Sequence, residues 1–124
     1  MNRNSFLLST LFLTSLLLSF SGATQAACRD TVVLVHGNTA SPSSWKNTYN
    51  KLRSSGYTTS QIKRPSWGSK SCAACNDHSG GELTTVKNAI NSAISNSCTG
   101  KIDVIGHSMG VTLAAKAIIN LGKT

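Results

Sequence analysis

One pentapeptide, Gly-His-Ser-Met-Gly at positions 106–110, limits what this 124-residue chain can fold into more than any other feature. A short, mostly apolar run precedes it at positions 102–105, and apolar residues at helical spacing follow it. A strand, a tight turn and a helix in this order form a nucleophile elbow, in which the turn lifts a serine side chain clear of the sheet. The positions two before and two after that serine must be small, and Gly106 and Gly110 meet this need around Ser108.

Two further strand–helix pairs are expected upstream of the elbow. Residues 31–35, Thr-Val-Val-Leu-Val, are apolar without alternation, which is typical of a strand buried on both faces. Residues 57–62 are a weaker, Thr-rich candidate for a second strand. Apolar residues at helical spacing predict helices within residues 41–56 and, over about fifteen residues, around 83–97. Strands that alternate with helices predict an α/β fold, with a mostly parallel sheet and flanking helices.

The first 27 residues have the three-part layout of a secretory signal peptide. A weakly basic start leads into an apolar core at positions 6–20 and a small-residue tail at positions 21–27. The core is shorter than the roughly 20 residues that span a membrane. We therefore expect a secreted or periplasmic protein with one domain, residues 28–124. The alternatives are a retained membrane anchor and a lipoprotein attached through Cys28.

Four cysteines follow the expected signal peptide, and an even number in an exported chain indicates disulfides. Cys28 and Cys98 each precede an expected strand by three or four residues. If those strands are parallel neighbours, both cysteines lie at the same end of the sheet. We therefore expect a Cys28–Cys98 bridge and a local Cys72–Cys75 bridge. The alternative is a metal or redox role for Cys72 and Cys75, although zinc would need two more ligands.

The chain is strongly basic, with 12 Lys and Arg against 4 Asp and Glu and a formal net charge of +8. The basic residues are scattered, and few aromatic residues lie among them. Nucleic-acid surfaces usually cluster their basic residues, so no nucleic-acid partner is expected. The pattern favours a soluble basic surface, which would also promote peripheral association with anionic lipid surfaces.

Ser108 is the expected nucleophile of the elbow. A serine hydroxyl becomes nucleophilic when a base takes its proton and a third group orients that base. His107 is adjacent in sequence, but the elbow directs neighbouring side chains apart. We therefore expect His107 to support the turn or to line the substrate site rather than to act as the base.

The turn after the first expected strand complements the elbow. Acyl transfer creates an oxyanion that needs two preorganised donors. One normally comes from the backbone N–H after the nucleophile, here that of Met109, and the other from the loop after an adjacent strand. His36 and Gly37 lead into that loop, so the N–H of Asn38 is the expected second donor, with Thr39 as the alternative. His36 is interpreted as a packed turn residue that shapes the loop.

These two motifs, in this order and about seventy residues apart, resemble those of the α/β-hydrolase superfamily. Within it, the chain is most similar to secreted bacterial lipases and esterases of the class 2 group, from residue 31 to the end. The resemblance implies hydrolysis of carboxylic esters, acylglycerols included, through a serine acyl-enzyme and without metal or cofactor. It assigns the nucleophile to Ser108 and the oxyanion donors to Asn38 and Met109. A lipid or a small ester is the implied substrate.

The chain departs from that family in one respect. The acid and the histidine of the triad follow the nucleophile in the family, but residues 111–124 contain no Asp, Glu or His. His78 and Asp77 lie upstream, in the wrong order for a triad. We therefore expect residues 28–124 to be the N-terminal part of a hydrolase domain, with little turnover alone. The alternatives are a non-catalytic secreted module that binds lipid or surfaces, and an acyltransferase.

Overall fold

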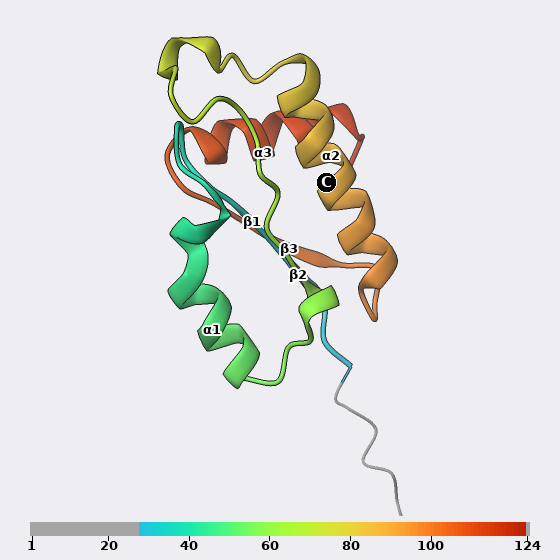
Figure 1. The fold of residues 1–124 in the computed structure, drawn as a ribbon. Coiled ribbons are helices and arrows are strands. Elements are labelled where there is room, and N and C mark those ends of the chain that lie inside the picture. Colours follow the sequence, from blue (N-terminus) through green and yellow to red (C-terminus); the bar gives the residue numbers. More distant parts are fainter. Residues whose placement is uncertain (1–27, 124) are drawn as a thin grey trace, which may run out of the picture.

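The computed structural model describes residues 28–123, and the expected signal peptide lies outside this part. A three-stranded parallel sheet forms its centre (Figure 1). The strands are β1 (Thr31–Val35), β2 (Ile62–Lys63) and β3 (Ile102–Gly106), in the order β2-β1-β3. The connection from β1 to β2 and the connection from β2 to β3 each contain an α-helix, as is usual for parallel crossovers.

Three α-helices cover the two faces of the sheet: α1 (Lys46–Ser54), α2 (Gly80–Asn96) and α3 (Met109–Asn120). Figure 1 shows α1 on one face, with α2 and α3 on the other. Three short 3₁₀ turns complete the described chain, namely η1 (Pro42–Trp45), η2 (Thr59–Gln61) and η3 (Ala73–Cys75). The expected α/β fold is confirmed.

The central strand β1 is buried along its whole length. Val33 and Val35 pack in the cluster formed by α2 and α3, whereas Val32 and Leu34 pack in a second cluster on the side of α1. Trp45 and the residues at helical spacing after it lie against this second cluster, as expected. Two-sided burial explains why the strand reads as a continuous apolar run.

The strand before the elbow, β3, is less buried than the central strand β1. In β3, partly buried residues alternate with exposed ones, and Ile105 is 43% exposed. The register pairs Asp103 with Val32 and Ile105 with Leu34, so both side chains lie on the face that α1 covers elsewhere. Since β3 is an edge strand and α1 lies over β1 and β2, this face of β3 stays open.

Two other boundaries differ from the prediction. The second strand is confined to Ile62 and Lys63, because Thr58 and Gln61 form a capping box that turns the preceding residues into η2. The second helix begins at Gly80, one turn before the first apolar residue of its periodic pattern, Leu83. Polar residues in a first helical turn leave no periodic signal, so the sequence placed this start too late.

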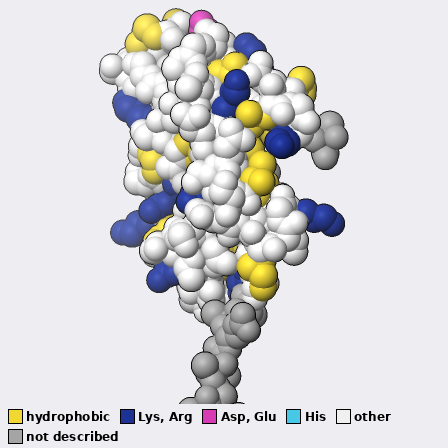
Figure 2. Space-filling model, turned by 90° about the vertical axis from the view of Figure 1, so that its right-hand side faces the viewer, with side chains coloured by type: hydrophobic (Ala, Val, Ile, Leu, Met, Phe, Trp, Pro, Cys, Tyr) yellow, Lys and Arg dark blue, Asp and Glu magenta, His cyan; other side chains and the backbone are white. Residues whose placement is uncertain are grey.

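Basic side chains are spread over the surface. Figure 2 shows Lys and Arg at separate places along one face, with single hydrophobic side chains between them. No helix within residues 28–123 combines the length and the apolarity that a membrane span requires.

Two disulfides join the expected pairs, Cys28–Cys98 and Cys72–Cys75. The first connects the segments that enter β1 and β3, and its Cα atoms are 5.6 Å apart. Asp30 reinforces the same end of the sheet, because its carboxylate accepts hydrogen bonds from the Ser97 hydroxyl at 2.7 Å and from the Thr99 N–H at 3.2 Å. The Ser97 hydroxyl, followed by that of Thr99, holds the pKa of Asp30 below its ordinary value.

The Asp30 cluster predicts a pH-dependent contribution to stability. A carboxylate with a lowered folded pKa stabilises fully above the ordinary Asp pKa of about 3.9, and that contribution is lost as the pH falls through the folded pKa. Thermal unfolding should therefore show a lower Tm for Asp30→Asn than for the wild type at neutral pH, and the difference should shrink as the pH falls below the ordinary Asp pKa of about 3.9. Asp103→Asn, which removes the same charge from exposed β3, is the control; an equal effect there would contradict the prediction.

Candidate active site

Ser108 connects β3 to α3 in a backbone conformation that non-glycine residues rarely adopt. Its φ is 52° and its ψ is −132°. The turn continues directly into the helix, since the N–H of Gly110 donates to the His107 carbonyl and the N–H of Val111 to the Ser108 carbonyl, each at 2.9 Å. A strained serine between a parallel strand and a helix is the geometry of a nucleophile elbow.

Both glycines of the pentapeptide are in close backbone contact. A Cβ at Gly106 would lie 2.7 Å from the Cα of Val111. A Cβ at Gly110 would overlap the carbonyl oxygens of Val35 and His36. Small residues at these two positions are therefore a requirement of the turn, as the spacing of the motif predicts.

The segment from His36 to Thr39, called here the oxyanion loop, lies against the elbow. The register pairs Val35 with Gly106, and the His107 N–H donates to the Val35 carbonyl at 3.1 Å. At Gly37 a Cβ would lie 3.2 Å from the Cβ of Ser108. Parallel pairing of β1 and β3 thus places the two sequence motifs side by side at one end of the sheet.

Two backbone donors at this end have no partner in the part of the chain that the structure describes. The N–H groups of Asn38 and Met109 make no hydrogen bond among residues 28–123. Met109 is the first residue of α3, where the positive end of the helix dipole favours an anion. Within the described residues, both N–H groups thus remain available to a further hydrogen-bond acceptor.

His36 is buried, with 1% of its surface exposed, and its ring stacks on Trp67 with 5.3 Å between centroids. Its Nδ1–H donates to the Gly37 carbonyl at 2.8 Å, so Nε2 is the acceptor for the Trp67 N–H at 3.3 Å. Burial lowers the pKa of His36, and the hydrogen bond to the Gly37 carbonyl offsets part of this effect. These contacts agree with a packed residue that shapes the loop.

A cavity of about 190 Å³ adjoins the elbow. It is lined by His36, Ser44, Trp45 and His107. His107, the residue before Ser108, thus contributes to the wall of this cavity. This position fits the expectation that His107 lines the site.

The upstream histidine makes no hydrogen bond with Ser108 in the described part of the chain. His78 Nε2 lies 3.3 Å from the Thr112 hydroxyl, one helical turn beyond Ser108, while Asp77 accepts from both the N–H and the hydroxyl of Ser79. The Ser79 hydroxyl lowers the pKa of Asp77 and takes up its carboxylate. Among residues 28–123 the Ser108 hydroxyl makes no hydrogen bond to a base.

Backbone strain gathers at this end of the sheet. The non-glycine residues with positive φ in the described part are Thr39 in the oxyanion loop, Ser108 in the elbow and His78 against the first turns of α3. Strained residues cluster at functional sites. The strain at Thr39 and His78 was not predicted, since neither strain nor contact can be inferred from their residue types.

A second segment contacts the oxyanion loop, and these contacts were not predicted from the sequence. Residues 69–76, called here the disulfide loop, contain the Cys72–Cys75 bridge and contact Asn38 through Ala73 and Asn76. Both cysteines of the CxxC pattern are therefore oxidised. In the described range no group of three His, Cys, Asp or Glu side chains could hold a metal ion.

A comparison with protein families decides the relationship. A family profile described as lipase (class 2) matches residues 29–124. The chain belongs to the class 2 lipase family. A search among curated proteins found no match. Family membership indicates lipase or esterase activity in general terms.

The close contact of Gly110 in this class 2 lipase chain leads to a stability prediction. Gly110→Ala should lower the free energy of unfolding by about 3 kcal/mol, because the new methyl group meets two backbone carbonyls that cannot move aside. Urea denaturation measures the change. The control is Gly81→Ala in the first turn of α2, where no atom lies within 4 Å and a gain of about 0.5 kcal/mol is expected. Equal stability of Gly110→Ala and the wild type would contradict the tight turn.

The positive φ of Ser108 leads to a second prediction. Ser108→Gly should be more stable than Ser108→Ala by about 1 kcal/mol, since glycine relieves the backbone strain that alanine retains. Both variants lack the hydroxyl, so their difference in urea denaturation reports the backbone alone. A less stable glycine variant would mean that the turn is not strained.

Proposed function

We propose that the protein is a carboxylic ester hydrolase that acts on acylglycerols or other lipid esters through a covalent intermediate on Ser108. The observation that carries the proposal is the strained elbow at Ser108, held against the oxyanion loop. Membership in the class 2 lipase family supports the same reaction class. The proposal needs no metal or cofactor.

In this proposal the Ser108 oxygen attacks the ester carbonyl while a base takes the hydroxyl proton. The carbonyl oxygen becomes an oxyanion, which the N–H groups of Asn38 and Met109 stabilise. The base then protonates the leaving alcohol, and water hydrolyses the acyl-enzyme by the same route. The cavity beside His107 receives one part of the substrate.

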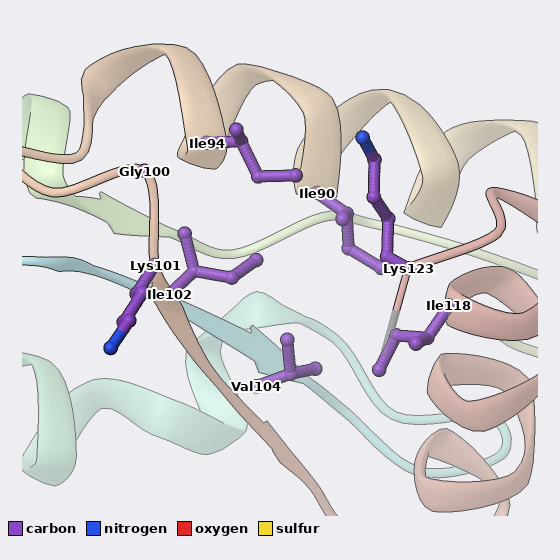
Figure 3. Close-up of a pocket in the computed structure, with 8 residues that line it drawn as sticks. All are labelled: Ile90, Ile94, Gly100, Lys101, Ile102, Val104, Ile118 and Lys123. Atoms are coloured by element: carbon purple, nitrogen blue, oxygen red, sulfur yellow. The ribbon is translucent and has the colours of Figure 1, made fainter.

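We infer that the base and its orienting acid come from polypeptide beyond residues 28–124, which then form the N-terminal part of the domain. The open edge of β3 supports this inference, because an unpaired strand edge is a site for a further strand. An apolar groove of about 460 Å³ lies along the same strand. Figure 3 shows Ile90 and Ile94 of α2 and Ile118 of α3 directed toward Ile102 and Val104.

We also propose that residues 1–27 direct export and are removed. The two disulfides support an oxidising compartment outside the cytoplasm. Mass spectrometry of the natural protein should then find an N-terminus near Cys28.

The proposal predicts Ser108-dependent ester hydrolysis by the protein as its source produces it. Hydrolysis of p-nitrophenyl butyrate and tributyrin should lose about 10⁵-fold or more in kcat in Ser108→Ala. Rapid quenching should trap an acyl group on Ser108. Hydrolysis that survives Ser108→Ala would refute the role of this serine, and an inactive natural protein with an intact fold would favour a binding module.

An assay of the 124-residue polypeptide by itself tests whether the base lies outside residues 28–124. Its hydrolysis of the same esters should not exceed that of its own Ser108→Ala variant, since no base contacts Ser108 within the described residues. Clear Ser108-dependent turnover would place the base inside this chain, and His78→Ala would then be the variant to test.

A further inference from the structure

We propose that Asn76 is a positioning residue for the oxyanion loop and that it acts through the side chain of Asn38. The disulfide loop that carries Asn76 then sets where the Asn38 N–H points. This inference rests on the proposed function, which assigns that N–H to the oxyanion.

The side chain of Asn38 contacts the disulfide loop. Its Nδ2 donates to the Ala73 carbonyl at 3.2 Å, and its Oδ1 accepts a hydrogen bond from the Nδ2 of Asn76. Both ends of the amide are therefore held by residues thirty-five or more positions away. A side chain held at both ends restricts rotation of the peptide groups on either side of it.

Asn76 is itself held in place. It is 7% exposed, and its Oδ1 accepts from the Ser69 N–H at 2.6 Å while its Nδ2 donates to the Ser69 carbonyl at 3.1 Å and to Asn38. The amide thus uses both of its N–H groups. Gly68 provides the space, since a Cβ there would lie 2.7 Å from Asn76 Oδ1. Rotation of this amide would leave buried polar groups unpaired, which is unfavourable.

The Cys72–Cys75 bridge joins the two contacts into one unit. Ala73, which accepts from Asn38, lies between the cysteines, and Asn76 follows the second of them. Within the loop the Cys72 N–H donates to the Ser69 hydroxyl at 3.0 Å and the Asn76 N–H to the Ala73 carbonyl at 3.3 Å. A covalently closed loop has few conformations, so its contacts with Asn38 form as a fixed pair.

A second anchor holds the other end of the oxyanion loop. The Trp67 indole N–H donates to the His36 carbonyl at 2.9 Å, and the rings of the two residues stack on each other. His36 is held by this anchor and Asn38 by the disulfide loop, so the backbone between them is fixed from both sides. Loss of the Asn38 anchor alone would leave the fold and the rest of the loop in place.

The test uses the natural, active protein and the isosteric variant Asn76→Asp. The new carboxylate still accepts from the Ser69 N–H, but it loses both hydrogen bonds that Asn76 Nδ2 donates, the one to Asn38 Oδ1 and the one to the Ser69 carbonyl. We expect kcat for p-nitrophenyl butyrate to fall about 100-fold with KM nearly unchanged, since a small misplacement of a catalytic group has this effect. Inhibition by butaneboronic acid, which forms a tetrahedral adduct with the serine, should weaken in parallel. The matched control is Asn91→Asp at an exposed position of α2, which should change neither kcat nor the inhibition by butaneboronic acid.

A double-mutant cycle with Asn38→Ala distinguishes positioning from general destabilisation. If Asn76 acts through Asn38, each single variant lowers kcat and the double variant is no slower than the slower single one. Additive losses, a rise in KM alone, or an unchanged kcat in Asn38→Ala would overturn the inference. Should Asn76→Asp not fold, Asn38→Ala breaks the same pair from its other side. Failure of the proposed function would appear separately, as a wild type that neither hydrolyses the ester nor binds the boronic acid.

Discussion

The contact between the backbone of Gly110 and the carbonyl groups of Val35 and His36 is the constraint on which the rest of the site depends. It brings the first turn of α3 onto the end of β1, and the parallel register of β1 and β3 makes this approach continuous with the sheet. Ser108, between β3 and this turn, has a positive φ. The site is therefore a property of backbone packing more than of any polar side chain.

Much of this could be predicted from the sequence because the constraint is local. A serine flanked by Gly106 and Gly110 and preceded by a strand has few conformations open to it, and the apolar run of β1 identifies the strand beside it. The pairing of Cys28 with Cys98 followed from the same geometry, since parallel neighbours start at one end of a sheet. Short-range steric demands leave a pattern in the sequence that can be recognised.

The parts that could not be predicted depend on contacts between distant polar residues. Asn76 pairs with Asn38 across thirty-eight positions, and neither residue type nor spacing distinguishes it from other asparagines of the chain. The exposure of Asp103 and Ile105 depends on how far α1 extends over the sheet, which no property of β3 itself determines. Thr58 and Gln61 shortened β2 through a side-chain cap that competes with strand pairing.

The bridge between Cys28 and Cys98 spans seventy positions and closes a covalent ring that contains β1, α1, β2 and α2. The elbow, β3 and α3 follow Cys98 outside this ring, so the polypeptide joins them to it at one point only, and hydrogen bonds and packing hold them against it. A single proteolytic cut anywhere in the ring would leave its fragments joined, whereas a cut between β3 and α3 would release the helix. In an environment with proteases, Ser108 thus lies on the part of the described chain that one cleavage can detach.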